Sequence, residues 1–256
     1  MNQSPSSDAV SAALEKVGFP LHVQGSGETD RAVVVLHPAP GLTPDVHAWL
    51  ERLAHEGFLA VAPELHHRRG VATIDPFTEF GGDVQAFAAA LPTDEELLQD
   101  VKALLQALTA AGVDEIHLLG FSYGGRAAYL VASTVPVSSA VSWYPSGVHE
   151  YAFRGNPGLP ALTGLGFFPS APWLGLAGGS DPILVPGELE AWQKALTASG
   201  APVSLVTYPE AGHAFDIHHG FGPDAPDTYD AAAFEDALSR TLAHFADHAQ
   251  RKGPST

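Results

Sequence analysis

A serine with a glycine two residues away on each side lies in the pentapeptide at 120–124, GFSYG. The pentapeptide comes directly after the apolar run at 116–119 and directly before a helical stretch at 126–131, so Ser122 is expected at a sharp turn between a strand and a helix. The glycines have no Cβ atom, which lets the strand and the helix pack closely. A hydroxyl held at such a turn can attack a carbonyl carbon, and we predict Ser122 as a nucleophile.

A serine hydroxyl attacks well only when a base takes its proton and an acid orients that base. At a turn of this kind the partners follow the serine in the order acid, then histidine, each after a later strand. Asp181 follows the strand expected at 173–177, and His213 follows the strand expected at 203–208. We therefore predict Ser122, Asp181 and His213 as catalytic residues. Asp181 has an alternative role as the cap of the helix that follows it.

Other residues compete for the roles of base and acid. His218 and His219 lie on the same loop as His213, and Glu210 is a weaker candidate for the acid. We prefer His213 because it is nearest the end of the strand, and because Gly212 before it allows a close approach.

Two backbone amides are expected to bind the negative charge that develops on the attacked carbonyl oxygen. One is the amide of Tyr123, at the start of the helix after the serine. The other should come from the loop after the strand at 32–37. Pro38 and Pro40 have no amide hydrogen, which leaves Ala39 as the predicted donor.

Short β-branched runs alternate with helical periodicities along the chain, and this alternation predicts an α/β fold with a mostly parallel, twisted sheet and helices on both faces. We predict strands at 32–37, 59–62, 116–119, 140–144, 173–177 and 203–208. We predict helices at 43–56, 97–108, 124–133, 186–199 and 234–245.

A chain of 256 residues fits a single domain, 1–256. Residues 1–28 are polar and are predicted as a loosely attached lead-in. The segments at 65–93 and 145–172 fit the sheet poorly, and the second is dense in glycine and proline. We interpret them as loops or a cap that shapes a pocket, because ligands bind beyond the carboxyl ends of parallel strands. A disordered connector is the alternative.

The composition narrows the choice of partners. The formal charge of −17 disfavours nucleic acid and anionic membrane surfaces, and no apolar run is long enough for a membrane span or a secretion signal. Without cysteine the chain has no disulfide and no thiol nucleophile. We expect a cytoplasmic protein that acts on a small molecule, and its oligomeric state stays open.

The segments that carry this chemistry resemble the dienelactone hydrolase family, a branch of the α/β-hydrolases. The resemblance extends from about residue 33 to the terminal helix. The matching segments are 62–65, 120–126, 181–182, 211–215 and 229–233. The resemblance implies an α/β-hydrolase fold and hydrolysis of an ester or a lactone, and it implies no cofactor.

Three positions depart from that family. Ser122 stands where the usual nucleophile is cysteine, and Pro38 stands where many members carry a glutamate. These two changes agree, because a serine activated by His213 needs no acidic partner to hold a thiol in reserve. A substrate-binding arginine of the family aligns near Ile217, which argues against a dienelactone substrate.

Cations and aromatic residues near the expected site are candidates for substrate binding. The predicted contacts are His37, Arg68, Arg69, Trp143 and Phe215. Arg154 is a further cation in the 145–172 segment. Arg126 is interpreted instead as a structural pairing residue, and core packing is an alternative role for Trp143.

Two other functions remain as alternatives. Metal-dependent hydrolysis is suggested by the adjacent pair His66 and His67 and by the histidines after the last strand, although their spacing does not place two ligands on one helix face. The second alternative is a non-catalytic protein, or another acyl transferase, on the same scaffold. The preferred prediction is a serine hydrolase that cleaves an ester or lactone through an acyl-enzyme and holds no metal.

Overall fold

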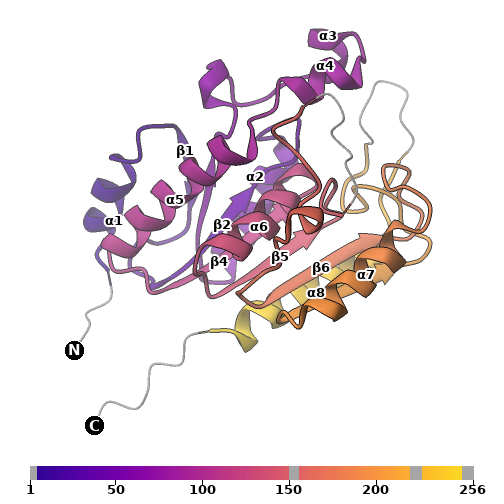
Figure 1. The fold of residues 1–256 in the computed structure, drawn as a ribbon. Helices are drawn as coiled ribbons and strands as arrows, with labels where there is room; N and C mark the ends of the chain where they lie inside the picture. Colours follow the sequence, from indigo (N-terminus) through magenta and orange to yellow (C-terminus); the bar gives the residue numbers. More distant parts are fainter. Residues whose placement is uncertain (1–4, 150–155, 220–226, 250–256) are drawn as a thin grey trace.

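The computed structural model describes residues 5–149, 156–219 and 227–249, which form a seven-stranded sheet with helices on both faces (Figure 1). The strands lie in the order β1-β3-β2-β4-β5-β6-β7. Their bounds are β1 Leu21–Gln24, β2 Arg31–Leu36, β3 Leu59–Pro63, β4 Glu115–Phe121, β5 Ser139–Trp143, β6 Trp173–Gly178 and β7 Val203–Tyr208. Only the β1–β3 pair is antiparallel among these strands. The predicted fold class and all six predicted strands are confirmed.

Helices cover the two faces of the sheet in two groups. The first group is α1 (Ser7–Leu14), α5 (Asp94–Ala110), α6 (Tyr123–Thr134) and α7 (Glu188–Ser199), and the second is α2 (Pro44–His55) and α8 (Ala231–Asp247). Helix α5 begins at a capping box in which Thr93 and Glu96 each accept a hydrogen bond from the other's backbone amide.

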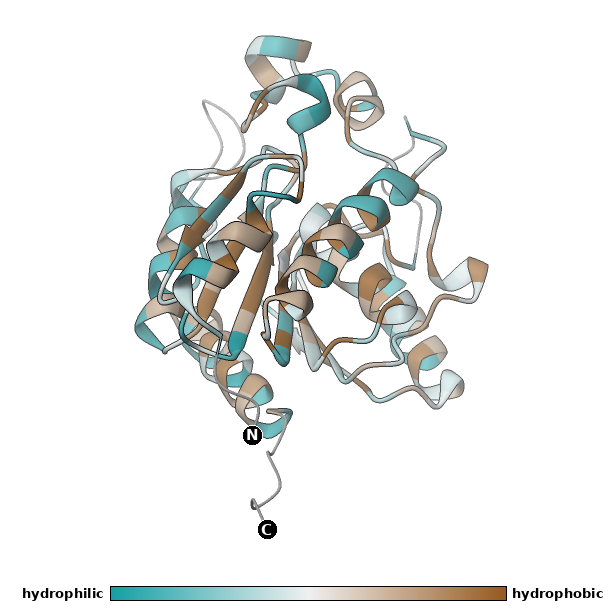
Figure 2. Cartoon of the chain, turned by 90° about the vertical axis from the view of Figure 1, so that its left-hand side faces the viewer, coloured by the Kyte–Doolittle hydropathy of each residue, from teal (hydrophilic) through white to brown (hydrophobic). Residues whose placement is uncertain are grey.

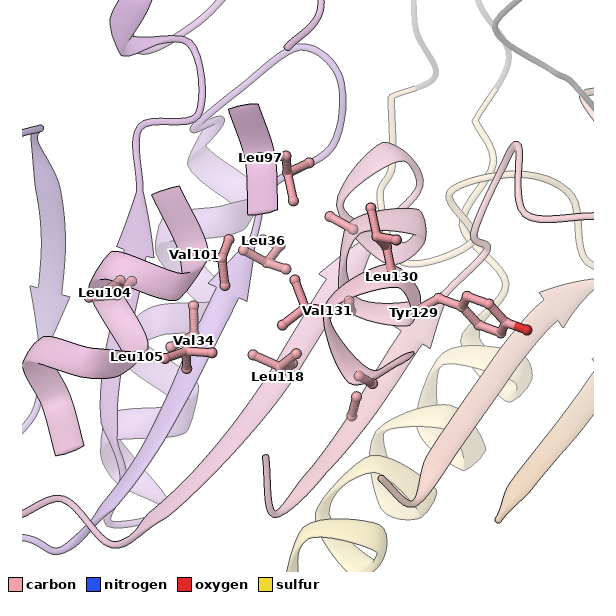
Figure 3. Packing of buried hydrophobic residues seen from close by; sticks show 14 of the residues in the cluster. Val34, Leu36, Leu97, Val101, Leu104, Leu105, Leu118, Tyr129, Leu130 and Val131 are labelled. Carbon is pink, nitrogen blue, oxygen red and sulfur yellow. The ribbon is translucent and has the colours of Figure 1, made fainter. Parts of the chain in front are cut away.

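Strand β2 shows why the sheet must be covered on both sides. Its side chains alternate between the faces, so Val34 and Leu36 pack under α5 and α6 whereas Val33 and Val35 pack under α2 and α8. Figure 3 shows the first of these clusters, with Leu118 of β4 between the strands and the helices. Figure 2 shows the central strands as mostly hydrophobic and the helices as mixed. Each fully buried Val or Leu contributes about 1.5–3 kcal/mol.

The N-terminal segment differs from its prediction as a loosely attached lead-in. Within residues 5–28, α1 buries Val10 and Leu14 in the cluster that contains α5, and β1 pairs with β3 at the edge of the sheet. The prediction was wrong because a four-residue strand has too short a pattern to recognise, and its pairing partner lies about forty residues away.

In the segments predicted as loops or a cap, the described residues form short helices joined by irregular chain. Residues 65–93 hold η1 (His67–Arg69), α3 (Pro76–Phe80) and α4 (Val84–Ala89), and Figure 1 shows α3 and α4 standing beyond the rest of the fold. The described part of 145–172 holds η2 (Thr163–Leu165). Arg126 anchors this part by donating to the carbonyl oxygens of Gly147 and Pro160, as its predicted structural role requires.

No helix in the described ranges combines the length and the hydropathy needed to span a bilayer.

Candidate active site

Ser122 lies at a strained turn between β4 and α6, where the sequence predicts it. Its backbone has φ 52° and ψ −113°, a region that residues other than glycine rarely adopt. A Cβ atom at Gly120 would overlap the carbonyl of Gly124, and a Cβ atom at Gly124 would overlap the carbonyl of Leu36. The two glycines are therefore required by close backbone contacts that hold the serine at the end of the strand.

Ser122, Asp181 and His213 come from three different loops and meet at one edge of the sheet. The Nε2 atom of His213 lies 2.9 Å from the Oγ atom of Ser122, and its Nδ1 atom lies 2.7 Å from Oδ2 of Asp181. All three residues are buried. Asp181 is held in place because its Oδ1 atom accepts a hydrogen bond of 2.8 Å from the amide of Ile183.

These contacts define the proton positions that the chemistry needs. The carboxylate of Asp181 can only accept, so Nδ1 of His213 carries a hydrogen. In the neutral ring Nε2 then has a free lone pair and accepts the hydroxyl proton of Ser122. The arrangement can therefore withdraw the proton from the serine as its oxygen attacks a carbonyl carbon.

His218, one of the alternative candidates for the base, pairs with a residue other than Ser122 or Asp181. His218 is exposed and pairs with Asp227 at 3.3 Å. One of the two reasons for preferring His213, a close approach at Gly212, was wrong, because a Cβ atom at Gly212 would meet nothing within 4 Å. The close approach occurs at Gly178 instead, where a Cβ atom would overlap the carbonyl of Gly212.

One predicted oxyanion donor follows Ser122 directly in the chain, and the other lines the same cavity as Ser122. Tyr123 is the first residue of α6, and its side chain is tied down by a hydrogen bond of 2.7 Å from its hydroxyl to the carbonyl of Pro92. Ala39 lines the cavity beside Ser122.

Two buried histidines hold the loop that carries Ala39. The amide of Leu65 donates to Nε2 of His37 at 3.1 Å, so Nδ1 of His37 carries the hydrogen and donates to the carbonyl of Pro38 at 2.8 Å. Nε2 of His66 donates to the carbonyl of Ala39 at 2.8 Å. Burial lowers the pKa of His37 to about 3 and also lowers the pKa of His66, so both rings are neutral near pH 7.

The predicted substrate contacts are wrong for three residues that are fully buried away from the cavity. His37 uses both ring nitrogens to hold the backbone. Trp143 is in the core and donates from Nε1 to Oγ1 of Thr241 at 3.0 Å. Phe215 stacks on Trp143 with ring centroids 5.4 Å apart. The sequence pattern of aromatic residues near the site reflects core packing.

The two arginines predicted to bind substrate are occupied by acidic residues. The guanidinium of Arg68 makes two hydrogen bonds to the carboxylate of Asp100, and that of Arg69 lies 3.0 Å from Oε2 of Glu79. Neither lines the cavity at Ser122. Arg154 lies outside the described residues.

A cavity of about 310 Å³ opens beside Ser122 and His213. Helices α3 and α4, with the turn between them, contribute Pro76, Phe77, Gly82, Val84, Phe87 and Ala88. The remaining wall comes from Ala39, Pro40, Ser146 and Ile183. The sequence analysis interpreted 65–93 and 145–172 as loops or a cap that shapes a pocket, but it did not name these wall residues or the two helices. Asp75 and Asp83 are N-caps whose position before short apolar runs could have indicated those helices.

Tyr144, which the sequence analysis did not place at the site, packs against the ring of His213 and is itself held by Asp216. The hydroxyl of Tyr144 donates to Asp216 at 2.6 Å, and Nε1 of Trp49 donates to the same carboxylate at 3.1 Å. The ring of Tyr144 lies edge-on to His213, with centroids 5.0 Å apart. Burial raises the pKa of Asp216. The aromatic ring thus limits how far the imidazole can turn.

The histidines considered as metal ligands are dispersed. His66 binds the Ala39 carbonyl, His67 lies 3.0 Å from Asp100, and His213 faces Ser122. Within the described residues no three histidine, aspartate or glutamate side chains form a group that could hold a metal ion.

Comparison with known proteins identifies the family of this chain. A model of the dienelactone hydrolase family matches residues 21–249. Proteins named putative carboxymethylenebutenolidase from Salmonella typhimurium and Escherichia coli K12 are each 32% identical to this chain, over 226 and 225 residues, and each alignment covers 86% of this chain and 78% of the relative.

Solved structures lead to the same family. The crystal structure of a putative dienelactone hydrolase from Klebsiella pneumoniae is 29% identical, has a TM-score of 0.70, and covers 89% of this chain and 92% of its own. The chain therefore belongs to the dienelactone hydrolase family of the α/β-hydrolase superfamily, and it is a carboxylic ester hydrolase.

Proposed function

We propose that this protein hydrolyses an ester or a lactone through a covalent acyl-enzyme formed on Ser122. The observation that carries the proposal is the pair of short contacts at His213, 2.9 Å to Oγ of Ser122 and 2.7 Å to Oδ2 of Asp181. The names of the relatives, putative carboxymethylenebutenolidases, support a lactone as one form of the substrate.

The first half of the reaction forms the acyl-enzyme. Oγ of Ser122 attacks the carbonyl carbon while its proton passes to Nε2 of His213, and the carbonyl oxygen becomes an anion. Asp181 stabilises the imidazolium through Nδ1. The C–O bond to the alcohol then breaks, the proton on Nε2 goes to the departing oxygen, and the acyl group stays on the serine. In a lactone the alcohol remains attached to the acyl chain.

The second half repeats these steps with water. His213 takes a proton from the water molecule as its oxygen attacks the acyl carbon, and then returns that proton to Oγ of Ser122 as the acid departs. In both halves the amides of Tyr123 and Ala39 donate to the oxyanion. One donor of this kind typically contributes about 10²–10³ in kcat.

Labelling tests the nucleophile directly. Wild-type protein treated with a fluorophosphonate probe should gain one phosphonyl group on Ser122, found by peptide mass spectrometry, and should lose its activity on p-nitrophenyl esters. Ser122→Ala should retain its fold by circular dichroism but lose both labelling and turnover.

Ser146→Ala is the matched control, because Ser146 lines the same cavity and has no contact with His213 among the described hydrogen bonds. This variant should still be labelled on Ser122. If labelling persists in Ser122→Ala but disappears in Ser146→Ala, the nucleophile is Ser146, and the proposal is overturned.

A further inference from the structure

The cavity beside Ser122 is lined mainly by apolar residues. Phe77, Val84 and Phe87 from α3 and α4 form one side, and Pro40 and Ile183 contribute to the rest. The polar side chains among its described lining residues are those of Ser122, Ser146 and His213. Two of these three take part in the proposed reaction, which leaves an apolar wall to contact the remainder of a substrate.

Apolar side chains also remain exposed at this cavity. Phe77 is 41% exposed, Val84 is 72% exposed and Ile183 is 43% exposed. A short helix that presents apolar groups to solvent gains nothing for its own folding, so such a group of side chains favours contact with an apolar ligand. Because these residues line the cavity and are also exposed, they extend its apolar surface toward solvent.

No cation balances a negative substrate among the described residues that line this cavity. The nearby candidates Arg68 and Arg69 are occupied by Asp100 and Glu79. Asp181 contacts His213 at 2.7 Å, and the whole chain has a formal charge of −17. The described lining therefore offers a substrate carboxylate no cationic partner in exchange for its hydration, and the charge of the whole chain repels it.

We propose that the site selects uncharged esters and lactones whose acyl group is apolar, and that α3, α4 and Ile183 form the surface that binds this group. The selection acts against substrates that carry a free carboxylate. The inference rests on the proposed function of Ser122, since it describes the substrate of the same site.

A matched pair of esters tests the selection. p-Nitrophenyl hexanoate and mono-p-nitrophenyl adipate have acyl chains of equal length and the same leaving group, and they differ in a terminal methyl against a terminal carboxylate. The expected kcat/KM is higher for the hexanoate by at least about 100-fold, because the carboxylate is desolvated without a partner. Equal values, or a preference for the adipate ester, would overturn the inference.

A charge placed on the wall tests the location. Val84→Arg should raise the adipate-to-hexanoate ratio of kcat/KM by about 10-fold, and added salt should reduce this gain. Val84→Gln changes the size and polarity without the charge, so it should lower kcat/KM for the hexanoate and raise the ratio by less than Val84→Arg does, with no dependence on added salt. Leu165→Arg adds the same charge at a residue that is 61% exposed and does not line the cavity. If Leu165→Arg shifts the ratio as much as Val84→Arg, the binding surface is not at α4.

The same assays separate this inference from the proposed function. If Ser122→Ala loses activity on both esters but wild type cleaves them equally well, the serine mechanism stands and the selection is wrong. If Ser122→Ala keeps activity on both esters, the proposed function is wrong and the inference falls with it.

Discussion

His37 donates its Nδ1 hydrogen to the carbonyl oxygen of Pro38 at 2.8 Å. That carbonyl belongs to the same planar peptide as the amide of Ala39. The amide of Gly41 donates to the same oxygen at 2.9 Å. Two donors on the oxygen fix the orientation of the peptide and polarise its N–H group, which strengthens a hydrogen bond that this N–H donates. His37 is thus placed to position the proposed oxyanion donor without contacting substrate.

Removing the ring of His37 should weaken transition-state binding. We expect His37→Leu to lower kcat by about 10- to 100-fold, with a smaller change in KM, because a displaced oxyanion donor loses part of its effect. The affinity for a trifluoromethyl ketone that mimics the acyl group should fall in parallel with kcat. A fall in kcat with no loss of affinity for this analogue would contradict a role at the oxyanion.

His37→Gln is the control for this prediction. Its side-chain amide can donate to the Pro38 carbonyl and accept from the Leu65 amide, so it should recover most of the kcat lost in His37→Leu. If the two variants are equally impaired, the loss reflects altered packing, and the positioning role is wrong.

Burial of His37 should also make the folded state sensitive to acid. The pKa of His37 is lowered from 6.5 to about 3, so between these values the unfolded chain binds a proton at this residue and the folded chain does not. Above pH 6.5 the folded state keeps the full stabilisation that comes from the neutral ring of His37. Below that pH, His37 alone should reduce the free energy of unfolding by about 1.4 kcal/mol per pH unit until pH approaches 3.

Urea denaturation between about pH 7.5 and about pH 4.5 measures this slope. His37→Gln removes the titrating group and should flatten the slope by about 1.4 kcal/mol per pH unit. Burial lowers the pKa of His66 and His117 as well, so part of the acid sensitivity should persist in the variant. An unchanged slope would show that His37 titrates normally in the folded state.

The catalytic candidates were predictable because the sequence records their positions locally. Ser122 is identified by glycines two residues away, and those glycines are needed at close backbone contacts. Asp181 and His213 each follow a parallel strand, and the carboxyl ends of parallel strands meet at one edge of the sheet. Residues that directly follow parallel strands in the sequence therefore lie close together in the structure.

The substrate contacts depend on tertiary facts that local patterns do not record. Arg68 is neutralised by Asp100, which lies 32 residues away on α5. An aromatic residue such as Trp143 has the same sequence signature in a pocket as in a core. Helices α3 and α4 have five and six residues, too few for a helical period to be recognised, yet they form much of the cavity wall.

Asp181 should matter through the tautomer of His213. In Asp181→Asn the side-chain amide can donate to Nδ1, which moves the ring hydrogen to Nε2, and Nε2 can then no longer accept the proton of Ser122. We expect kcat to fall by about 10⁴, with the fold retained, as in another Ser-His-Asp enzyme. Steady-state kinetics on a neutral p-nitrophenyl ester measures this loss.

Two acidic residues serve as controls for Asp181. Asp227→Asn breaks an exposed pair with His218 and should leave kcat unchanged. Glu210→Gln tests the weaker candidate for the acid. A larger loss of kcat in Glu210→Gln than in Asp181→Asn would show that the acid was assigned to the wrong residue.

Glycines at the turn and beside the histidine should respond differently to alanine. In Gly120→Ala the new methyl group would overlap the Gly124 carbonyl, and rigid backbone on both sides cannot move away. We expect Gly120→Ala to lose at least about 3 kcal/mol of stability or to fail to fold.

In Gly212→Ala the methyl group would meet nothing within 4 Å, and the backbone φ is not positive. The stability of this variant should stay within about 0.5 kcal/mol of wild type. Urea denaturation of the pair gives the comparison, and equal losses would mean that the close contact at the turn does not limit the choice of residue there.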